Sequence, residues 1–66
     1  MLPEPRDGWE VHLVPAYRAH KDYTCPGCPS GIPYGQGHVV AWPEGDNDDR
    51  RHWHKHCWRL VARRGW

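Results

Sequence analysis

Apolar residues alternate with polar ones near the start of the chain, over residues 9–14. Trp9, Val11 and Leu13 fall on one face of this segment if it is extended, and Pro15 follows it. Because proline cannot continue a strand ladder, we expect a short β-strand that ends before Pro15.

A second strand is predicted at residues 38–42, where β-branched valines lie between Gly37 and Pro43. The polar residues 43–49 that follow are typical of a turn. Residues 50–53 are expected to return as the hairpin partner of the second strand.

Helical spacing appears only toward the end of the sequence. Trp58, Val61 and Ala62 recur at i, i+3 and i+4, which predicts one apolar face on a helix over residues 54–63. The polar segment 17–23 is interpreted as a link, with a single helical turn as the alternative.

These elements indicate an α+β domain with a short antiparallel sheet (a hairpin) and a C-terminal helix. Residues 1–8, rich in proline and charge, are predicted to form a flexible arm. Residues 9–66 are predicted to form one domain, whose metal core spans residues 23–60.

The predicted metal core rests on the spacing C-x2-C-x25-H-x2-C, which Cys25, Cys28, His54 and Cys57 supply. Thiolate and imidazole are the ligands of structural zinc, which takes four of them in a tetrahedron. Residues 26–27, proline and glycine, suit the tight turn between the first two ligands. A helical turn would direct His54 and Cys57 to one side.

The cysteines and histidines allow other interpretations. Three cysteines are an awkward number for a disulfide framework, and a C-x-x-C redox pair belongs in a larger domain. His52 and His56 are the alternatives to His54 as the fourth ligand. Together with His38, they are otherwise expected to be surface groups or groups behind the metal ligands.

A chain of 66 residues that lacks phenylalanine builds a small core, so zinc would supply much of the folding free energy. Trp53 and Trp58 are expected to belong to this core, with Ile32 beside the metal. The sequence has no apolar run long enough for a membrane span and starts without signal-peptide features. With reduced thiols, this favours the cytoplasm.

Charge is unevenly distributed, although the formal net charge is only +1. The acidic residues Glu44, Asp46, Asp48 and Asp49 crowd the predicted turn, and no acidic residue follows Asp49. Cationic and aromatic residues, which suit phosphates and unpaired bases, then predict a nucleic-acid-binding face. The candidate residues are Arg50, Arg51, Lys55, Arg59, Arg63, Arg64 and Trp66.

The order of these features resembles the zinc finger of poly(ADP-ribose) polymerases and DNA ligase III. The resemblance covers roughly residues 23–60 and includes Ile32-Pro33-x-Gly35 and the run from His52 to Trp58. It implies a compact antiparallel sheet with a C-terminal helix, zinc on the four ligands named above, and recognition of DNA breaks and ends. The span between the ligand pairs is a few residues shorter here, and its loop is acidic.

The run over residues 14–25 also looks like short actinobacterial proteins often labelled "ATP/GTP-binding". The sequence has neither a phosphate-binding P-loop nor a G-x-G-x-x-G turn after a strand. We therefore expect no nucleotide cofactor.

Three classes of function follow from these observations. The first is a module that binds DNA or RNA, and the second is a structural or protein-interaction module in a transcription- or ribosome-associated assembly. The third, an enzyme, is disfavoured because four protein ligands leave zinc no position for a reactive water and leave no free thiolate.

Overall fold

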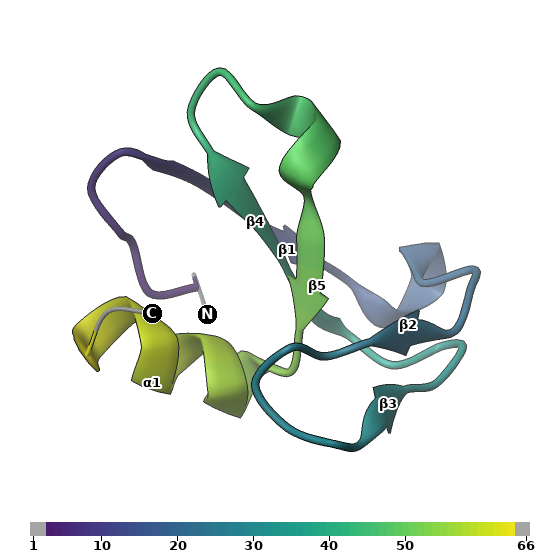
Figure 1. The fold of residues 1–66 in the computed structure, drawn as a ribbon. Coiled ribbons are helices and arrows are strands. Elements are labelled where there is room, and N and C mark those ends of the chain that lie inside the picture. The colour runs from purple at the N-terminus through teal and green to yellow at the C-terminus, as the bar shows by residue number, and fades with distance from the viewer. Residues whose placement is uncertain (1–2, 65–66) are drawn as a thin grey trace.

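The computed structural model describes residues 3–64 and has the predicted α+β class (Figure 1). A three-stranded antiparallel sheet has the order β1-β4-β5, and a smaller sheet pairs β2 with β3. The strands are β1 (Trp9–Val14), β2 (Tyr23–Thr24), β3 (Gly31–Ile32), β4 (His38–Pro43) and β5 (Arg51–Trp53), followed by the helix α1 (Lys55–Arg64).

The predicted elements lie where the sequence pattern placed them, with small shifts at their ends. Strand β1 matches residues 9–14, and β4 extends one residue further, to Pro43. Strand β5 and helix α1 each begin one residue later than predicted. A short 3₁₀ helix at Ala16–Arg18 overlaps the start of the predicted link, and another at Asn47–Asp49 lies within the hairpin turn.

One face of the main sheet packs on α1, and this face carries most of the core. Val11 lies opposite Ala41, and Val39 lies between Leu13 and Trp53, so their side chains share that face. The alternation that predicted β1 is therefore confirmed. Leu13, near the end of the strand, keeps 38% of its surface exposed.

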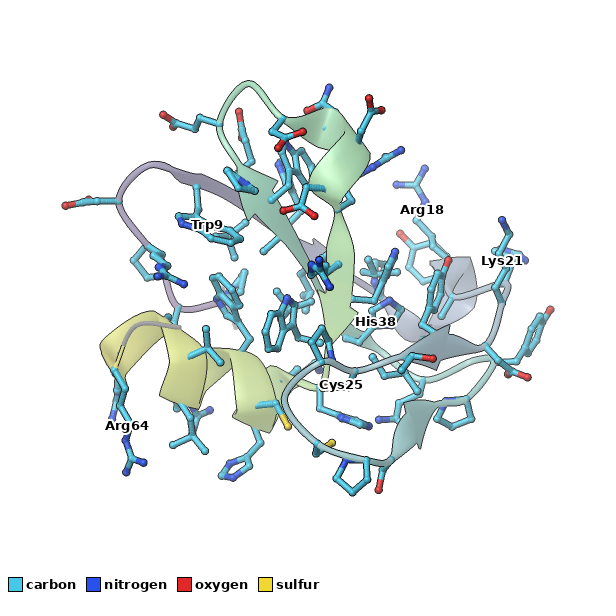
Figure 2. The ribbon with its side chains drawn as sticks, in the orientation of Figure 1. Trp9, Arg18, Lys21, Cys25, His38 and Arg64 are labelled. Carbon is cyan, nitrogen blue, oxygen red and sulfur yellow. The ribbon has the colours of Figure 1, made fainter. Side chains whose placement is uncertain are left out.

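Tryptophan rings fill the space between the sheet and the helix. Trp53 and Trp58 are fully buried, with ring centroids 5.7 Å apart, and Trp9 lies 5.9 Å from Trp58. Figure 2 shows Trp9 above the helix α1. The predicted core role of Trp53 and Trp58 is confirmed, and it agrees with the absence of phenylalanine from the sequence.

The described part of the N-terminal arm, residues 3–8, lies against the helix. Nε1 of Trp58 donates a hydrogen bond to the carbonyl oxygen of Glu4 at 2.7 Å, and the Glu4 carboxylate lies 3.6 Å from Nε of Arg63. The Arg6 guanidinium lies 4.7 Å from the centroid of the Trp9 ring. Within residues 3–64, no helix has the length and apolar character that crossing a membrane requires.

We predict that Trp58→Ala lowers the free energy of unfolding by about 3–5 kcal/mol, because it empties the space between helix and sheet. Urea unfolding at saturating metal, followed by far-UV circular dichroism, measures this loss. Tyr17→Ala is the matched control, since Tyr17 is 79% exposed, and it should change stability by no more than about 0.5 kcal/mol. Equal stability of the two variants would contradict this view of the core.

Candidate metal centre

The first two cysteines lie on a loop that a small hairpin closes. Strands β2 and β3 pair Tyr23 with Ile32 and Thr24 with Gly31, so residues 25–30 form the connection between them. Ile32 is fully buried and anchors the hairpin against the core, as expected from the sequence. The pairing itself was not predicted, because each strand has only two residues and no alternation can be recognised over that length.

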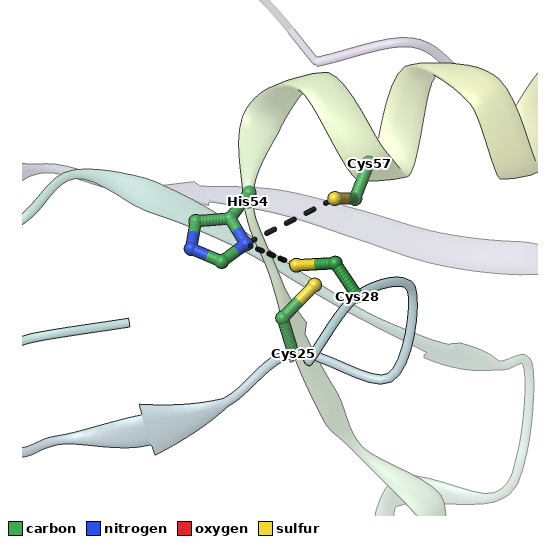
Figure 3. Close-up of side chains that lie close together, drawn as sticks. All are labelled: Cys25, Cys28, His54 and Cys57. Carbon is green, nitrogen blue, oxygen red and sulfur yellow. Dashed lines mark hydrogen bonds between the residues drawn. The ribbon is translucent and has the colours of Figure 1, made fainter. Parts of the chain in front are cut away.

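The other two residues of the cluster lie at the start of the helix. His54 immediately precedes α1, and its carbonyl oxygen accepts the first helical hydrogen bond, from the amide of Trp58. Cys57 lies one turn further on, so both side chains point to the same side. Figure 3 shows them facing Cys25 and Cys28 across the loop.

The four predicted ligands meet in one cluster that fits a metal ion. Their donor atoms all lie within 4.8 Å of one another. Nδ1 of His54 is 3.3 Å from Sγ of Cys28 and 3.9 Å from Sγ of Cys57. A tetrahedral zinc ion with its usual bond lengths would hold a nitrogen and a sulfur ligand about 3.5 Å apart. The separations therefore match a tetrahedral site without rearrangement of the backbone.

The orientation of His54 adds a second sign of a metal site. Its Nε2 lies 3.1 Å from the carbonyl oxygen of Gly31. A carbonyl only accepts, so Nε2 carries the proton and the lone pair of the neutral ring is on Nδ1, facing the three sulfurs. Metal-binding histidines commonly use such a hydrogen bond on the other nitrogen to fix the ring. The carbonyl group of Gly31 therefore belongs to the site, although the spacing of the ligands did not indicate it.

The neighbouring histidines do not reach this cluster. His56 is exposed on the helix, and His52 lies in β5 beside Tyr23 and His38. Of the three alternating histidines, the structure brings only His54 to the cysteines. This separation follows from the boundary between strand and helix, which turns His54 away from the direction of His52.

The cysteines influence one another's ionisation. Burial raises the pKa of the Cys25 thiol, but backbone hydrogen bonds from His54 and Gly27, with contacts from the His54 side chain and Cys57, outweigh it and lower the pKa to about 7. Burial, together with contacts and repulsion from Cys28 and Cys25, raises the pKa of Cys57 to about 12. Crowded thiols resist simultaneous ionisation unless a cation neutralises them.

A second cluster of ring side chains lies on the opposite face of the main sheet. His38 is fully buried, with Nε2 2.8 Å from Nδ1 of His52, and the His52 ring stacks on Tyr23 at 3.7 Å between centroids. Burial lowers the pKa of His52 to about 4, and repulsion by Arg50, by Lys21 and by His38 whenever the His38 ring is protonated adds to the effect. The prediction that His38 is a surface group or lies behind the metal ligands is wrong.

Strand alternation contained the signal for this second cluster. Residues 38 and 40 share a face of β4, and Val40 pairs with His52, so His38 and His52 are diagonal neighbours. Once the register of β4 and β5 is known, the contact between His38 and His52 follows, because every second side chain of a strand lies on the same face. The sequence pattern alone left that register open.

The structure divides the predicted cationic face into two groups. Arg50 and Arg51 lie at the hairpin, where Nη2 of Arg51 contacts Asp49 at 3.3 Å and the Arg50 guanidinium lies 5.9 Å from the Trp42 ring centroid. Lys55, Arg59, Arg63 and Arg64 lie on α1. Figure 1 shows the hairpin turn and the helix at opposite ends of the molecule. Trp66, the last predicted member, lies outside the described residues.

We predict that Gly27→Ala weakens the metal site. A Cβ atom at this position would lie 3.1 Å from Cβ of Cys57 and 3.3 Å from the Trp53 ring, and Trp53 is fully buried. Such overpacking costs about 1–3 kcal/mol, measurable as lost metal affinity or stability. Gly37→Ala is the matched control because its Cβ would meet no atom closer than 3.5 Å. Unchanged metal affinity in the Gly27 variant would contradict the close packing of this turn.

Comparison with known proteins gives a family but no matching structure. A protein-family model, described as "Rv1322 family protein", matches residues 3–59. Uncharacterized protein Rv1322 of Mycobacterium tuberculosis and uncharacterized protein Mb1356 of Mycobacterium bovis are each 51% identical to the chain over 61 residues. Each alignment covers 86% of this chain and 62% of the relative's length. No solved structure matches the chain.

These matches leave the resemblance to poly(ADP-ribose) polymerase fingers as a prediction. The family model spans both cysteines of the loop, the ligand histidine and Cys57, so the whole candidate metal centre lies inside the matched region. On the extent of this match and on the identity to its relatives, the chain belongs to the Rv1322 family.

Proposed function

We propose that the cluster holds one structural zinc ion and that the protein is a zinc-stabilised binding module. The observation that carries the first part is the set of donors: three cysteine sulfurs and one imidazole, within 4.8 Å of one another. Soft sulfur ligands in a tetrahedral arrangement favour zinc over magnesium or calcium, which prefer oxygen.

The four protein ligands would complete the coordination shell of the zinc ion, which supports a role without catalysis. A catalytic zinc ion keeps one position for water or substrate, whereas Cys25, Cys28, His54 and Cys57 would fill all four. The three cysteines are all engaged in this way, so none remains as a nucleophile.

Helix α1 supports nucleic acid as the bound partner. Its ten residues include no acidic side chain, and its exposed positions form one continuous stripe. Trp58 is buried on the opposite side of the helix. Four cations on such a stripe would neutralise backbone phosphates and release counterions. The exposed stripe consists of Lys55, His56, Arg59, Leu60, Arg63 and Arg64.

A protein partner is the second candidate function, favoured by a hollow of about 300 Å³ beside the helix. Leu13 on its wall and Leu60 on α1 expose 38% and 39% of their surfaces. A partner with apolar side chains would cover these groups. The hollow is lined by Pro3, Glu4, Leu13, Val39, Lys55, Trp58 and Arg59.

The ligand assignment predicts different outcomes for two nearby histidines. His54→Ala should lower zinc affinity by at least about two orders of magnitude, because four ligands share a binding free energy of roughly 10–16 kcal/mol. His56→Ala, at an exposed position two residues away, should leave affinity unchanged. Competition with a chromophoric chelator measures both. Equal losses in the two variants would mean that the wrong histidine has been assigned.

Zinc affinity should rise with pH. In the metal-free protein Cys57 keeps its proton at neutral pH, since its pKa is raised to about 12, and Cys25 loses its proton only near pH 7. The metal-bound state carries fewer protons, so both affinity and metal-dependent stability fall as pH drops through about 7. A logarithmic plot of the zinc association constant against pH should have a slope of at least about one. A flat plot would rule out thiolate ligands.

For the helix, we predict that Arg59→Gln weakens binding of single-stranded DNA and RNA alike and reduces the slope of log K against log salt by about one. Fluorescence anisotropy with labelled oligonucleotides over a salt series measures both quantities. Arg18→Gln is the control, because Figure 2 places Arg18 at the opposite end of the molecule from the helix terminus at Arg64. Absence of binding by the parent protein at low salt would refute the proposed nucleic-acid function.

A further inference from the structure

The buried histidine pair on the far face of the sheet has a fixed direction of hydrogen bonding. Nδ1 of His38 lies 2.9 Å from the carbonyl oxygen of Gln36, so Nδ1 carries the proton. His38 is fully buried, and its ring nitrogens contact a carbonyl and an imidazole rather than a carboxylate, so a charged ring there would be costly. Nε2 of His38 is therefore an acceptor.

This direction determines which nitrogen of His52 has a lone pair. Nδ1 of His52, 2.8 Å away, must donate to Nε2 of His38. The neutral His52 ring then keeps its lone pair on Nε2. Within residues 3–64, Nε2 has no hydrogen-bond partner, and it is not one of the buried polar atoms that lack one. A hydrogen-bond acceptor is thus held open to solvent.

His52 lines a hollow of about 280 Å³ together with two arginines and the hydroxyl-bearing residues Tyr23 and Thr24. Arg50 lies on this wall, where its Nε donates a hydrogen bond to the carbonyl oxygen of Asn47 at 3.1 Å. Arg51 also lies on the wall, although Asp49 at 3.3 Å offsets part of its charge. The hollow is lined by Tyr23, Thr24, Pro26, Arg50, Arg51 and His52.

We propose that this hollow binds a ribonucleotide unit of single-stranded RNA. Arg50 would meet the phosphate, and Nε2 of His52 would accept a hydrogen bond from the ribose 2′-hydroxyl. A phosphate diester cannot donate to this acceptor, and deoxyribose lacks the hydroxyl, so the combination favours RNA over DNA. This inference rests on the proposed nucleic-acid function and adds a second surface, on the other face of the sheet from α1.

The rigid surroundings of His52 support a role in recognition. Its ring is held by the stack on Tyr23 and the hydrogen bond to His38. The side chain therefore loses little conformational entropy when it binds a ligand. A solvated surface histidine would have neither restraint. The same chemistry, a phosphate near a free ribose hydroxyl, also occurs in a free ribonucleotide, which the test must separate from RNA.

The test compares three single-stranded oligonucleotides of one sequence, RNA, DNA and 2′-O-methyl RNA, by fluorescence anisotropy with the zinc-loaded protein. The parent should bind RNA roughly fivefold more tightly than DNA, the ratio expected for one net hydrogen bond. The 2′-O-methyl RNA, which cannot donate, should bind like DNA. His52→Phe should bring the RNA affinity down to the DNA level, whereas Arg50→Gln should weaken all three.

His20→Phe is the matched control, because His20 is an exposed histidine outside the hollow, and it should keep the preference for RNA. The absorption spectrum of the cobalt-substituted protein reports whether each variant is folded. If His52→Phe does not fold, the parent's response to 2′-O-methylation still decides the matter. A ¹⁵N spectrum in which Nε2 of His52 carries the proton at neutral pH would overturn the proposal.

Equal binding of RNA and DNA by the parent would refute the ribose contact and leave the proposed function intact. If the parent protein binds neither RNA nor DNA, both the ribose contact and the proposed nucleic-acid function are refuted. Binding of 5′-AMP in preference to 5′-dAMP, without any binding of RNA, would assign the hollow to a free ribonucleotide and overturn the RNA proposal.

Discussion

The meeting of four metal-ligating side chains from two distant segments is the constraint on which this structure depends. The loop between β2 and β3 supplies two of these side chains, and the junction of β5 and α1 supplies the other two. Without a cation, the sulfurs of Cys25, Cys28 and Cys57 would be crowded together with no compensating charge. A bound cation would turn the same crowding into an attraction that holds the hairpin to the helix and both to the main sheet.

The rest of the core is too small to hold the elements in place by itself. Besides the tryptophans, the fully buried apolar side chains include Ile32, Val39 and Ala41, which are modest in size. The metal centre and the tryptophan cluster adjoin. A Cβ atom added to Gly27, in the loop between Cys25 and Cys28, would lie only 3.3 Å from the Trp53 ring. Apolar packing and metal binding therefore reinforce each other over one small region, and we expect them to be lost together.

The sequence predicted the features that have a period or a spacing. Alternation predicted β1 and β4, the i, i+3, i+4 pattern predicted α1, and the spacing of cysteines and His54 predicted the cluster. It did not predict the β2–β3 hairpin, whose strands are too short to show a pattern, or the buried His38, whose role depends on strand register. The cationic face was inferred from residues close in sequence, but the fold places Arg50 and Arg51 beside the hairpin turn rather than on α1.

The most direct test of the account is removal of the metal from purified, folded protein by a strong chelator at neutral pH. We predict that elemental analysis finds one zinc ion per chain before treatment. Chelation should then abolish the far-UV circular dichroism of the fold and shift the tryptophan fluorescence to that of exposed rings, and added zinc should restore both. Well-folded protein that contains no metal, or spectra that stay unchanged in excess chelator, would contradict the account.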